Sequence, residues 1–450
     1  MLVNYSFKNF KSYLNNAKIT FEASKIRQYE KDNCFNCDDT LLQNKKLLKS
    51  LLIFGPNSAG KTNSINALKY ARFLVLHSAN AAKDNENIFD DPDTFMFDEA
   101  AEKVPTEFKI EFIVDKTNEF FEYYFSFLDG KVIKESLYKR DKSNSVRLSN
   151  KKCLYDRING NFKKINEQFK KILEVVDINE KILLLSLCGS SIKENICVDG
   201  RNCYNWFANI LFANTDNNCF DIYDDNPEYL KIATEIIRMT DPVLSSISCE
   251  KEKIDLGITD YKNPQAIINA LEKNKKSVKG GLRLSDDGLY SYDLCTCYKK
   301  KKNDGSLEDI KLSIFEQASS VSSGVRKLII YLAPIIKTLK EGGLVLVDEI
   351  DTALHYLYSK LIIELFNSSV INKNNGQAIF TSHNIRLMDE RVRGDQIYLV
   401  NKSISGVSSI TSLYKNETKT LKNHNISERY LQGLYKSVAN IDMSVIEKLF

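Results

Sequence analysis

The chain has 450 residues, of which 43% are hydrophobic and 27% are charged, and its formal net charge at pH 7 is +4. These values are typical of a globular protein and argue against a mainly disordered, collagen-like or membrane-embedded chain. At ~150 residues per domain the length allows up to three domains. The small excess of basic residues does not by itself indicate a nucleic-acid partner.

The amino-terminal segment lacks the continuous apolar core of a signal peptide, and no later run approaches the ~18 apolar residues of a membrane span. We therefore expect a cytoplasmic protein with no membrane partner. The ten cysteines should be reduced thiols, because disulfide frameworks belong to small secreted domains. Two close pairs, Cys34 with Cys37 and Cys295 with Cys297, leave a zinc site open, although they lie far apart in the sequence.

The first part of the chain predicts strands followed by a loop and a helix. Loose alternation of apolar residues from Leu2 to Phe10 predicts an amino-terminal strand, and the apolar run from Leu51 to Phe54 is typical of a strand buried in a sheet. The sequence GPNSAGKT follows at 55–62, and apolar residues then recur at helical spacing from Ile65 to Leu74. The order is strand, glycine-bounded loop, helix.

The middle of the chain predicts mixed structure. The stretch from 77 to about 101 is acidic and loop-like, and alternating apolar residues predict a β-meander at about 105–140. Helix-length patterns dominate at about 160–250, including one from Ile165 to Leu187, and a β-hairpin follows at about 282–298. The four lysines at 299–302 predict a solvated hairpin tip, with nucleic-acid contact as the open alternative.

The last third of the chain alternates between helices and strands. The patterns predict helices at 323–339 and 356–366 and strands at 344–347, 378–381 and 397–400. Such alternation favours an α/β fold with a mostly parallel sheet.

Residues 55–62 match the pattern G-x-x-x-x-G-K-[ST], with the required strand before it and helix after it. Glycines let backbone N–H groups close around phosphates, Lys61 supplies positive charge to the β- and γ-phosphates, and the Thr62 hydroxyl ligates Mg²⁺. The loop therefore predicts a nucleoside triphosphate site. Its expected binding residues are Gly55, Asn57, Ser58, Ala59, Gly60, Lys61 and Thr62.

A second motif, LVLVDE at 344–349, is an apolar strand that ends in two carboxylates. Asp348 at the carboxyl end of a buried strand can hold Mg²⁺, and Glu349 can accept a proton from an attacking water. The pair favours hydrolysis over transfer to a second substrate. Because 287 positions separate Lys61 from Asp348, a large insertion must lie between the two motifs.

Two further features fit the same sheet edge. His383 follows the predicted strand at 378–381, where it could sense or polarise the γ-phosphate. Ser322, Ser323 and Gly324 precede a helix, and on their own they indicate a helix N-cap that can also bind an anion.

Together the motifs resemble ABC-type ATPases of the AAA family, in the group that contains the SMC and RecF proteins and the OLD-family nucleases. The chain is most similar to the ATPase component of bacterial abortive-infection anti-phage systems, which is found beside an RloB-like Toprim protein. The matching segments are YSFKNFKS at 5–12, GPNSAGKTN at 55–63, PTEFKIEF at 105–112, SSG at 322–324, LVDEIDTALH at 346–355, TSHN at 381–384 and RGDQIYLV at 393–400.

The resemblance implies a P-loop ABC-type ATPase core that binds ATP and Mg²⁺ and is formed by residues 1–76 and 316–450. Residues 77–315 would form a lateral β-subdomain and an inserted helical arm. Ser322, Ser323 and Gly324 would be the signature motif, which reaches the γ-phosphate held by the other subunit of a homodimer. Asn63 would extend the nucleotide loop, Asp351 would cross the dimer interface, and His383 would be the switch histidine.

Three functions remain open on these grounds. The first is a dimeric ATPase that regulates a partner effector in anti-phage defence, such as a Toprim/RloB-like nuclease, since this chain has no nuclease motif of its own. The alternative is a RecF- or SMC-like DNA-binding ATPase in DNA repair or chromosome maintenance. The third is a nucleotide-locked scaffold with negligible turnover.

Overall fold

The computed structural model describes residues 1–37, 42, 45–90, 93–140, 151–190, 196–213, 218–256, 267, 270, 280–285, 288–316, 320–416 and 425–435. The chain divides into two compact units. The first unit comprises Met1–Leu211, Gly342–Asp351 and Tyr356–Phe450, and the second comprises Phe212–Glu341 and Thr352–His355.

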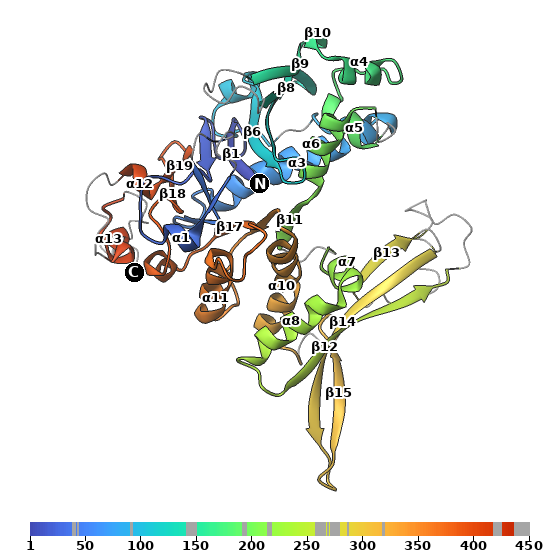
Figure 1. The fold of residues 1–450 in the computed structure, drawn as a ribbon, viewed down its shortest axis with the longest axis vertical. Coiled ribbons are helices and arrows are strands. Elements are labelled where there is room, and N and C mark those ends of the chain that lie inside the picture. Colours follow the sequence, from blue (N-terminus) through green and yellow to red (C-terminus); the bar gives the residue numbers. More distant parts are fainter. Residues whose placement is uncertain are drawn as a thin grey trace, which may run out of the picture. The chain divides into compact units, whose positions relative to one another are not determined.

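A seven-stranded antiparallel sheet forms one layer of the first unit (Figure 1). Among the described residues its strands are, in spatial order, β10 (Asn161–Ile165), β9 (Lys151–Ile158), β8 (Lys131–Arg140), β7 (Glu119–Leu128), β6 (Thr106–Val114), β1 (Leu2–Lys8) and β2 (Ala17–Thr20). The central strands β1, β6 and β7 carry buried aromatic side chains, such as Phe108 and Phe125. The meander predicted at about 105–140 corresponds to β6, β7 and β8.

A second, mostly parallel sheet carries the motif-bearing strands. Its described strands are, in spatial order, β11 (Ile210–Ala213), β16 (Leu344–Val347), β17 (Gln377–Thr381), β5 (Ser50–Phe54), β18 (Ile397–Lys402) and β19 (Ser408–Ser412). β16, β17, β5 and β18 are parallel to their neighbours, and β19 returns antiparallel to β18. The strands predicted at 344–347, 378–381 and 397–400 are confirmed. A short pair, β3 (Cys34–Asn36) with β4 (Lys46–Leu48), forms a separate two-stranded sheet, and the Gln377 side chain of β17 donates to the Leu48 carbonyl of β4 at 3.3 Å. The protein therefore has a mixed α/β fold with two large sheets.

Helix α3 (Lys61–Lys83) packs between the two large sheets. The Tyr5 hydroxyl of β1 donates to the carbonyl of Ser64 at 3.0 Å, and the Tyr70 ring stacks 5.4 Å from Phe10. On its other side α3 contacts β17. The helix continues seven residues beyond 76, so the prediction of a loop from 77 is wrong at its start, because Ser78, Ala79 and Ala81 are buried there.

The remaining helices of the first unit are shorter. They are α1 (Glu30–Asn33), α4 (Glu167–Leu173), α5 (Leu184–Ser190), α6 (Val198–Ala208), α11 (Tyr356–Asn367), α12 (Leu413–Asn416) and α13 (Ile426–Leu431), with 3₁₀ turns η1 (Glu99–Lys103) and η2 (Ile385–Asp389). The helix predicted at 356–366 is α11. None of the helices in the described ranges combines the length and apolar character needed to cross a membrane.

The second unit contains a small antiparallel sheet and three longer helices within its described residues. The strands are β12 (Leu244–Ile254), β14 (Gly288–Lys301), β13 (Gly281–Ser285) and β15 (Leu307–Ser313), and the helices are α7 (Asn218–Asp225), α8 (Pro227–Arg238) and α10 (Ser323–Glu341). α10 packs against α7 and α8, where the Tyr223 hydroxyl donates to the carbonyl of Ile329 at 2.7 Å. The predicted hairpin at 282–298 is β13 with β14, and β14 continues into a second hairpin with β15.

The segment at about 160–250 is not one helical arm. It contains β10, β11 and part of β12 among its helices, and the predicted helix from Ile165 to Leu187 is two short helices, α4 and α5. The segment is also divided, since α4, α5 and α6 belong to the first unit while α7 and α8 belong to the second. Helical periodicity is local and therefore does not report which unit a helix packs against. The predicted domain limits at 76 and 315 remain predictions.

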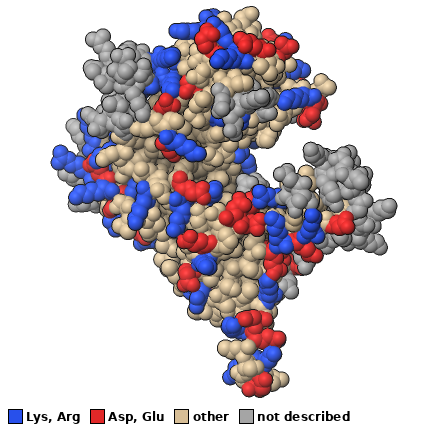
Figure 2. Space-filling view, turned by 45° about the vertical axis from the view of Figure 1, so that its right-hand side comes forward, with Lys and Arg blue, Asp and Glu red and all other residues tan. Residues whose placement is uncertain are grey.

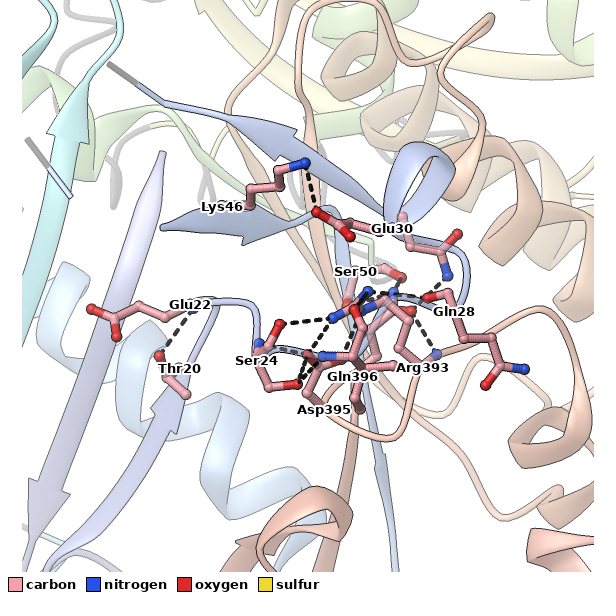
Figure 3. Close-up of polar contacts among 12 residues, drawn as sticks. Thr20, Glu22, Ser24, Gln28, Glu30, Lys46, Ser50, Arg393, Asp395 and Gln396 are labelled. Carbon is pink, nitrogen blue, oxygen red and sulfur yellow. Dashed lines mark hydrogen bonds and ion pairs between the residues drawn. The ribbon is translucent and has the colours of Figure 1, made fainter. Parts of the chain in front are cut away.

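A buried polar network fastens an amino-terminal loop beside β18 (Figure 3). The guanidinium of Arg393, 0% exposed, pairs with both carboxylate oxygens of Asp395 at 2.7 and 2.9 Å. It also donates to the carbonyls of Ile26 and Gln28 at 2.7 and 3.0 Å, while Asp395 accepts from Ser24 N at 2.7 Å. Because each charge is paired and hydrogen-bonded, burial of the pair is tolerated and the loop at 24–28 is held against the sheet.

A second buried carboxylate, Glu135 in β8, joins the antiparallel sheet to α5. It accepts hydrogen bonds from the Tyr123 and Tyr155 hydroxyls at 2.9 and 2.8 Å and from Arg157 Nε at 2.8 Å. It also accepts from the backbone N–H groups of Leu184 and Leu185 at the start of α5. Glu135 is 0% exposed, so its negative charge depends on these donors.

We expect Glu135→Gln to destabilise the first unit by about 3 kcal/mol or more, because Arg157 would be left as a buried charge without its carboxylate. Chemical denaturation followed by near-UV circular dichroism would measure the change. The control is Glu180→Gln, which removes a surface ion pair with Lys131 at 3.5 Å and should cost at most about 1 kcal/mol. Equal losses for the two variants would contradict the role assigned to Glu135.

Candidate functional site

The parallel strands bring three motifs to one edge of the six-stranded sheet. β17 pairs with β16 on one side and with β5 on the other, all three in the same direction. Gly55 follows β5, Asp348 follows β16, and Ser382 and His383 follow β17. Since the carboxyl ends of parallel neighbours lie side by side, residues far apart in the sequence meet at this edge.

The loop between β5 and α3 needs glycine at both of its ends for lack of space. A Cβ atom on Gly55 would lie 2.5 Å from the carbonyl oxygen of Val400. A Cβ atom on Gly60 would lie 2.7 Å from Ser408 Oγ and 2.8 Å from Ser12 Oγ, and Gly60 also has φ 113°. Val400 of β18 and Ser408 of β19 thus lie directly against the loop and fix its path.

The ammonium of Lys61 lies inside this loop. Lys61 is 5% exposed, and its Nζ donates to the carbonyl oxygens of Gly55 and Pro56 at 2.8 and 3.0 Å. The same Nζ lies 3.4 Å from Nδ1 of His383. A buried ammonium held by carbonyl oxygens at a sheet edge is well placed to receive a polyanion.

The electrostatics of Lys61 reflect two opposing influences. Burial lowers its pKa, and the carboxylates of Glu349, Asp348 and Asp351 act in the opposite direction. The carboxylates after β16 therefore act on the ammonium of Lys61 by charge, while its Nζ donates hydrogen bonds to carbonyl oxygens of the loop.

Asp348 is held between two hydroxyls. Thr62 Oγ1 donates to Asp348 Oδ1 at 3.3 Å, and the Thr381 hydroxyl at the end of β17 donates to the same oxygen. Thr381 Oγ1 also accepts the backbone N–H of Glu349 at 2.7 Å. Thr381 thus orients both acids, a role that the sequence pattern around it did not indicate.

Glu349 has φ 49°, which is uncommon for a residue other than glycine. The backbone N–H of the next residue, Ile350, donates to the Thr381 carbonyl at 3.0 Å, so the hydroxyl and the carbonyl of Thr381 together hold the turn. The result is a carboxylate whose Oε1 lies 3.8 Å from His383 Nε2. Strained backbone of this kind is enriched at functional sites.

Asp351 contacts the turn after β17 within its own unit. Both of its carboxylate oxygens accept the backbone N–H of His383 at 3.1 Å. Asp351 therefore positions the histidine segment.

The other predicted loop residues have different surroundings. Asn57 and Ser58 are exposed, and the carbonyl of the buried Ala59 accepts from the Ser408 hydroxyl at 2.5 Å. Asn63 Nδ2 donates to Ser12 Oγ at 2.8 Å. Ser12 and Ser408 were not predicted as site residues, because nothing in the local pattern signals that they support this loop.

Ser322, Ser323 and Gly324 belong to the second unit. Ser322 Oγ accepts the backbone N–H of Val325 at 3.2 Å, which is an N-cap for α10. Ser322 and Ser323 are exposed. The structure therefore brings together the loop at 55–62 with Asp348, Glu349, Asp351 and His383, and it describes the Ser322–Gly324 segment separately.

A cavity of about 340 Å³ opens beside the loop in the first unit. Its lining combines the end of β5 and the loop with the turn after β17 and α13, namely Phe54, Gly55, Pro56, Asn57, Ser382, His383, Ile385 and Tyr430. The Tyr430 side chain is a contribution that sequence patterns did not indicate. The cavity adjoins Lys61 through its carbonyl partners Gly55 and Pro56.

The donor set beside the loop fits Mg²⁺. Thr62 supplies a hydroxyl and Asp348 a carboxylate, and these oxygens already lie 3.3 Å apart. Hard oxygen ligands of this kind, few in number, suit a magnesium ion that is also held by phosphates. Across the described ranges, no three or more His, Cys, Asp or Glu side chains form a group that could hold a metal ion. Cys34, Cys37, Cys295 and Cys297 lie within these ranges and therefore belong to no such group.

Residues 251–389 match a family model described as "AAA domain, putative AbiEii toxin, Type IV TA system". The matched segment is less than half of the chain and contains Asp348, Glu349 and His383, whereas the loop at 55–62 lies outside it. The match supports an ATPase domain of the AAA type. No curated protein matches the chain.

Two solved structures are similar over most of the chain. An SMC head bound to the C-winged helix domain of ScpA is 13% identical, with 94% of this chain and 98% of that chain covered and a TM-score of 0.39. The SMC head domain from Thermotoga maritima is 14% identical, with 91% and 98% covered and a TM-score of 0.37.

We expect Thr381→Val to lower phosphate release from Mg-ATP about 10- to 100-fold, since the variant loses the hydroxyl that orients Asp348 and Glu349. Thr381→Ser should restore the rate. The control is Thr234→Val, which removes a buried hydroxyl bonded to the Leu230 carbonyl in α8 and should leave the rate unchanged. A wild-type rate in Thr381→Val would show that the hydroxyl does not position the acids.

Proposed function

We propose that this protein is an ABC-type ATPase that binds ATP with Mg²⁺ and hydrolyses it. The observation that carries the proposal is the meeting of Lys61, Thr62, Asp348, Glu349 and His383 at the carboxyl edge of one parallel sheet. The match of residues 251–389 to an AAA domain supports the same activity.

The site residues divide the work between binding and proton transfer. Lys61 and the backbone N–H groups of the loop at 55–62 would bind the phosphates, with the ammonium moving from its carbonyl partners to phosphate oxygens. Thr62 and Asp348 would hold Mg²⁺, which supplies positive charge next to the phosphates when bound.

Proton transfer falls to the pair beside the metal ligands. Glu349 would accept a proton from the attacking water at its Oε1, and His383 Nε2, 3.8 Å away, would position the carboxylate or the phosphate. Thr381 and Asp351 hold the two turns that carry Glu349 and His383, so these side chains need little reorganisation for the reaction.

Turnover would require a second subunit in this proposal. The exposed Ser322 and Ser323, with Gly324, would form the signature motif at the amino end of α10 and reach a γ-phosphate held by the other subunit. An exposed helix N-terminus has unpaired N–H groups that favour a phosphate. Asn63 and Asp351 would complete the nucleotide site and the interface of this homodimer.

The ATPase cycle would regulate a partner effector in anti-phage defence in the cytoplasm, with a Toprim/RloB-like nuclease as the expected effector. The description of the matched family, which names a toxin and a Type IV TA system, supports a role in a multi-component system of this kind. Because the sequence has no Toprim or HNH constellation, any nuclease activity in this proposal would come from another chain.

Glu349→Gln should retain ATP and accumulate as a dimer, while its rate of hydrolysis falls about 100-fold or more because the proton acceptor is lost. Light scattering after gel filtration would report the dimer, and bound nucleotide would be quantified from the same fraction. The control is Glu228→Gln on the exposed face of α8, which should behave as the wild type. Undiminished hydrolysis in Glu349→Gln would rule out Glu349 as the base.

The alternative, a RecF- or SMC-like DNA-binding ATPase, gains little support from the lysines at 299–302. Lys299 pairs with Asp309 at 2.7 Å and Lys302 with Glu308 at 3.7 Å across the β14–β15 hairpin. Figure 2 shows acidic and basic side chains interspersed along this hairpin. A lysine that is already paired with a carboxylate displaces fewer of the counterions bound to DNA. Its contribution to binding a phosphate backbone is therefore weaker.

We therefore expect weak binding of duplex DNA with a shallow dependence on salt, measured by filter binding at two salt concentrations. Strong binding that falls steeply with salt would favour the DNA-binding alternative. The variant Asp309→Asn removes the carboxylate that pairs with Lys299. It should therefore bind DNA more tightly than the wild type.

A further inference from the structure

Helices α5 and α6 cross at two glycines in the first unit. A Cβ atom on Gly189 would lie 2.0 Å from the ring of Tyr204, so this ring occupies the space beside the α5 backbone. Arg201 Nη1 donates to the Gly189 carbonyl at 2.9 Å and holds the crossing from the other side. The two helices therefore approach more closely than larger residues would allow.

Two cysteine sulfurs lie together in this crossing. The Cβ position of Gly200 is 2.4 Å from Cys188 Sγ and 2.9 Å from Cys197 Sγ, so the two sulfurs are adjacent and Gly200 leaves room for them. Cys188 lies in α5 and is 2% exposed, while Cys197 is the N-cap residue of α6 and is 3% exposed. Neither cysteine takes part in the nucleotide site.

The two thiols have unequal environments. A hydrogen bond with Cys188 lowers the pKa of Cys197, burial acts in the opposite direction, and the backbone N–H of Gly200 lowers it further. Burial raises the pKa of Cys188 well above its usual value. One thiol is thus favoured as the nucleophilic thiolate, and the other remains protonated beside it.

We propose that Cys188 and Cys197 are a redox-active pair that a hydroperoxide converts into a reversible disulfide between α5 and α6. The Cys197 thiolate attacks the outer oxygen of the hydroperoxide, and the O–O bond breaks. An alcohol or water leaves, and Cys197 becomes a sulfenic acid. Cys188 then attacks this sulfur, the S–O bond breaks, and water leaves. Two thiols lose two electrons and two protons, and the hydroperoxide is reduced.

The disulfide would tighten the contact that holds the far half of α3. Ser186 Oγ of α5 accepts the backbone N–H of Ala79 at 3.0 Å, and Arg72 Nε donates to the Phe207 carbonyl of α6 at 2.9 Å. Since α3 begins at Lys61, oxidation would change the restraint on the helix that carries the nucleotide loop. The disulfide itself does not depend on the proposed ATPase activity.

Peptide mapping tests the pair directly. The full chain would be treated with a small excess of hydrogen peroxide, alkylated with N-ethylmaleimide, digested and analysed without reduction. We expect a linked peptide that joins Cys188 to Cys197 as the main product and that disappears after dithiothreitol. Peroxide should raise the Tm of the wild type, and the rise should be lost in Cys197→Ser and kept in Cys153→Ser, whose thiol lies in β9.

Two results would overturn the proposal. One is a wild-type map in which both Cys188 and Cys197 are alkylated or separately oxidised after peroxide treatment. The other is a linked peptide that contains the nearby buried Cys203 in place of either residue. Because the wild-type map alone gives the answer, the test stands even where a cysteine variant folds poorly.

Discussion

Parallel pairing of β17 with β5 and β16 is the constraint on which the site depends. Main-chain hydrogen bonds fix the register Ile379 with Leu51 and Leu346 with Ile379, so the strand ends cannot slip relative to one another. The Gln377 side chain at the start of β17 adds bonds to Leu2 on both its oxygen and its nitrogen, at 2.6 and 3.0 Å. The sheet thus brings together groups that lie hundreds of residues apart in the chain.

Buried polar groups hold loops and helices against these sheets. The Arg393–Asp395 pair and the Glu135 cluster sit at places where loops and helices join the sheets, and every charge there is hydrogen-bonded. The strained turn at Glu349 depends on the same kind of support, through Thr381. Rigid surroundings let the acids of the site hold one geometry before any ligand arrives.

Local patterns in the sequence predicted the strand, loop and helix around Lys61 and the strands that end at Asp348 and His383. Here the residue types that the chemistry needs coincide with strong local structure, since glycines bound the loop and apolar runs define the buried strands. The insertion between the motifs was also predictable from their separation. The roles of Asp351, Ser322 and the dimer came only from the resemblance, and they stay proposals.

Other features could not be predicted, because they depend on contacts between distant segments. Ser12 and Ser408 support the loop at 55–62 from the segment after β1 and from β19, and no local pattern signals this supporting role for either residue. The division of the helices at about 160–250 between two units is likewise a matter of tertiary packing. Helix α3 extends past residue 76 because its last turns are buried against α5. Next to α5, Leu183 N donates to Ser78 Oγ at 3.1 Å.

Calorimetric titration with Mg-ATP would decide whether the loop around Lys61 binds ATP at this sheet edge. The wild type should bind saturably, whereas Lys61→Ala should lose binding and still unfold cooperatively near the wild-type Tm, because the removed ammonium is the principal cation beside the phosphates. Unchanged affinity in Lys61→Ala, or no binding by the folded wild type, would show that the loop at 55–62 is not the ATP site.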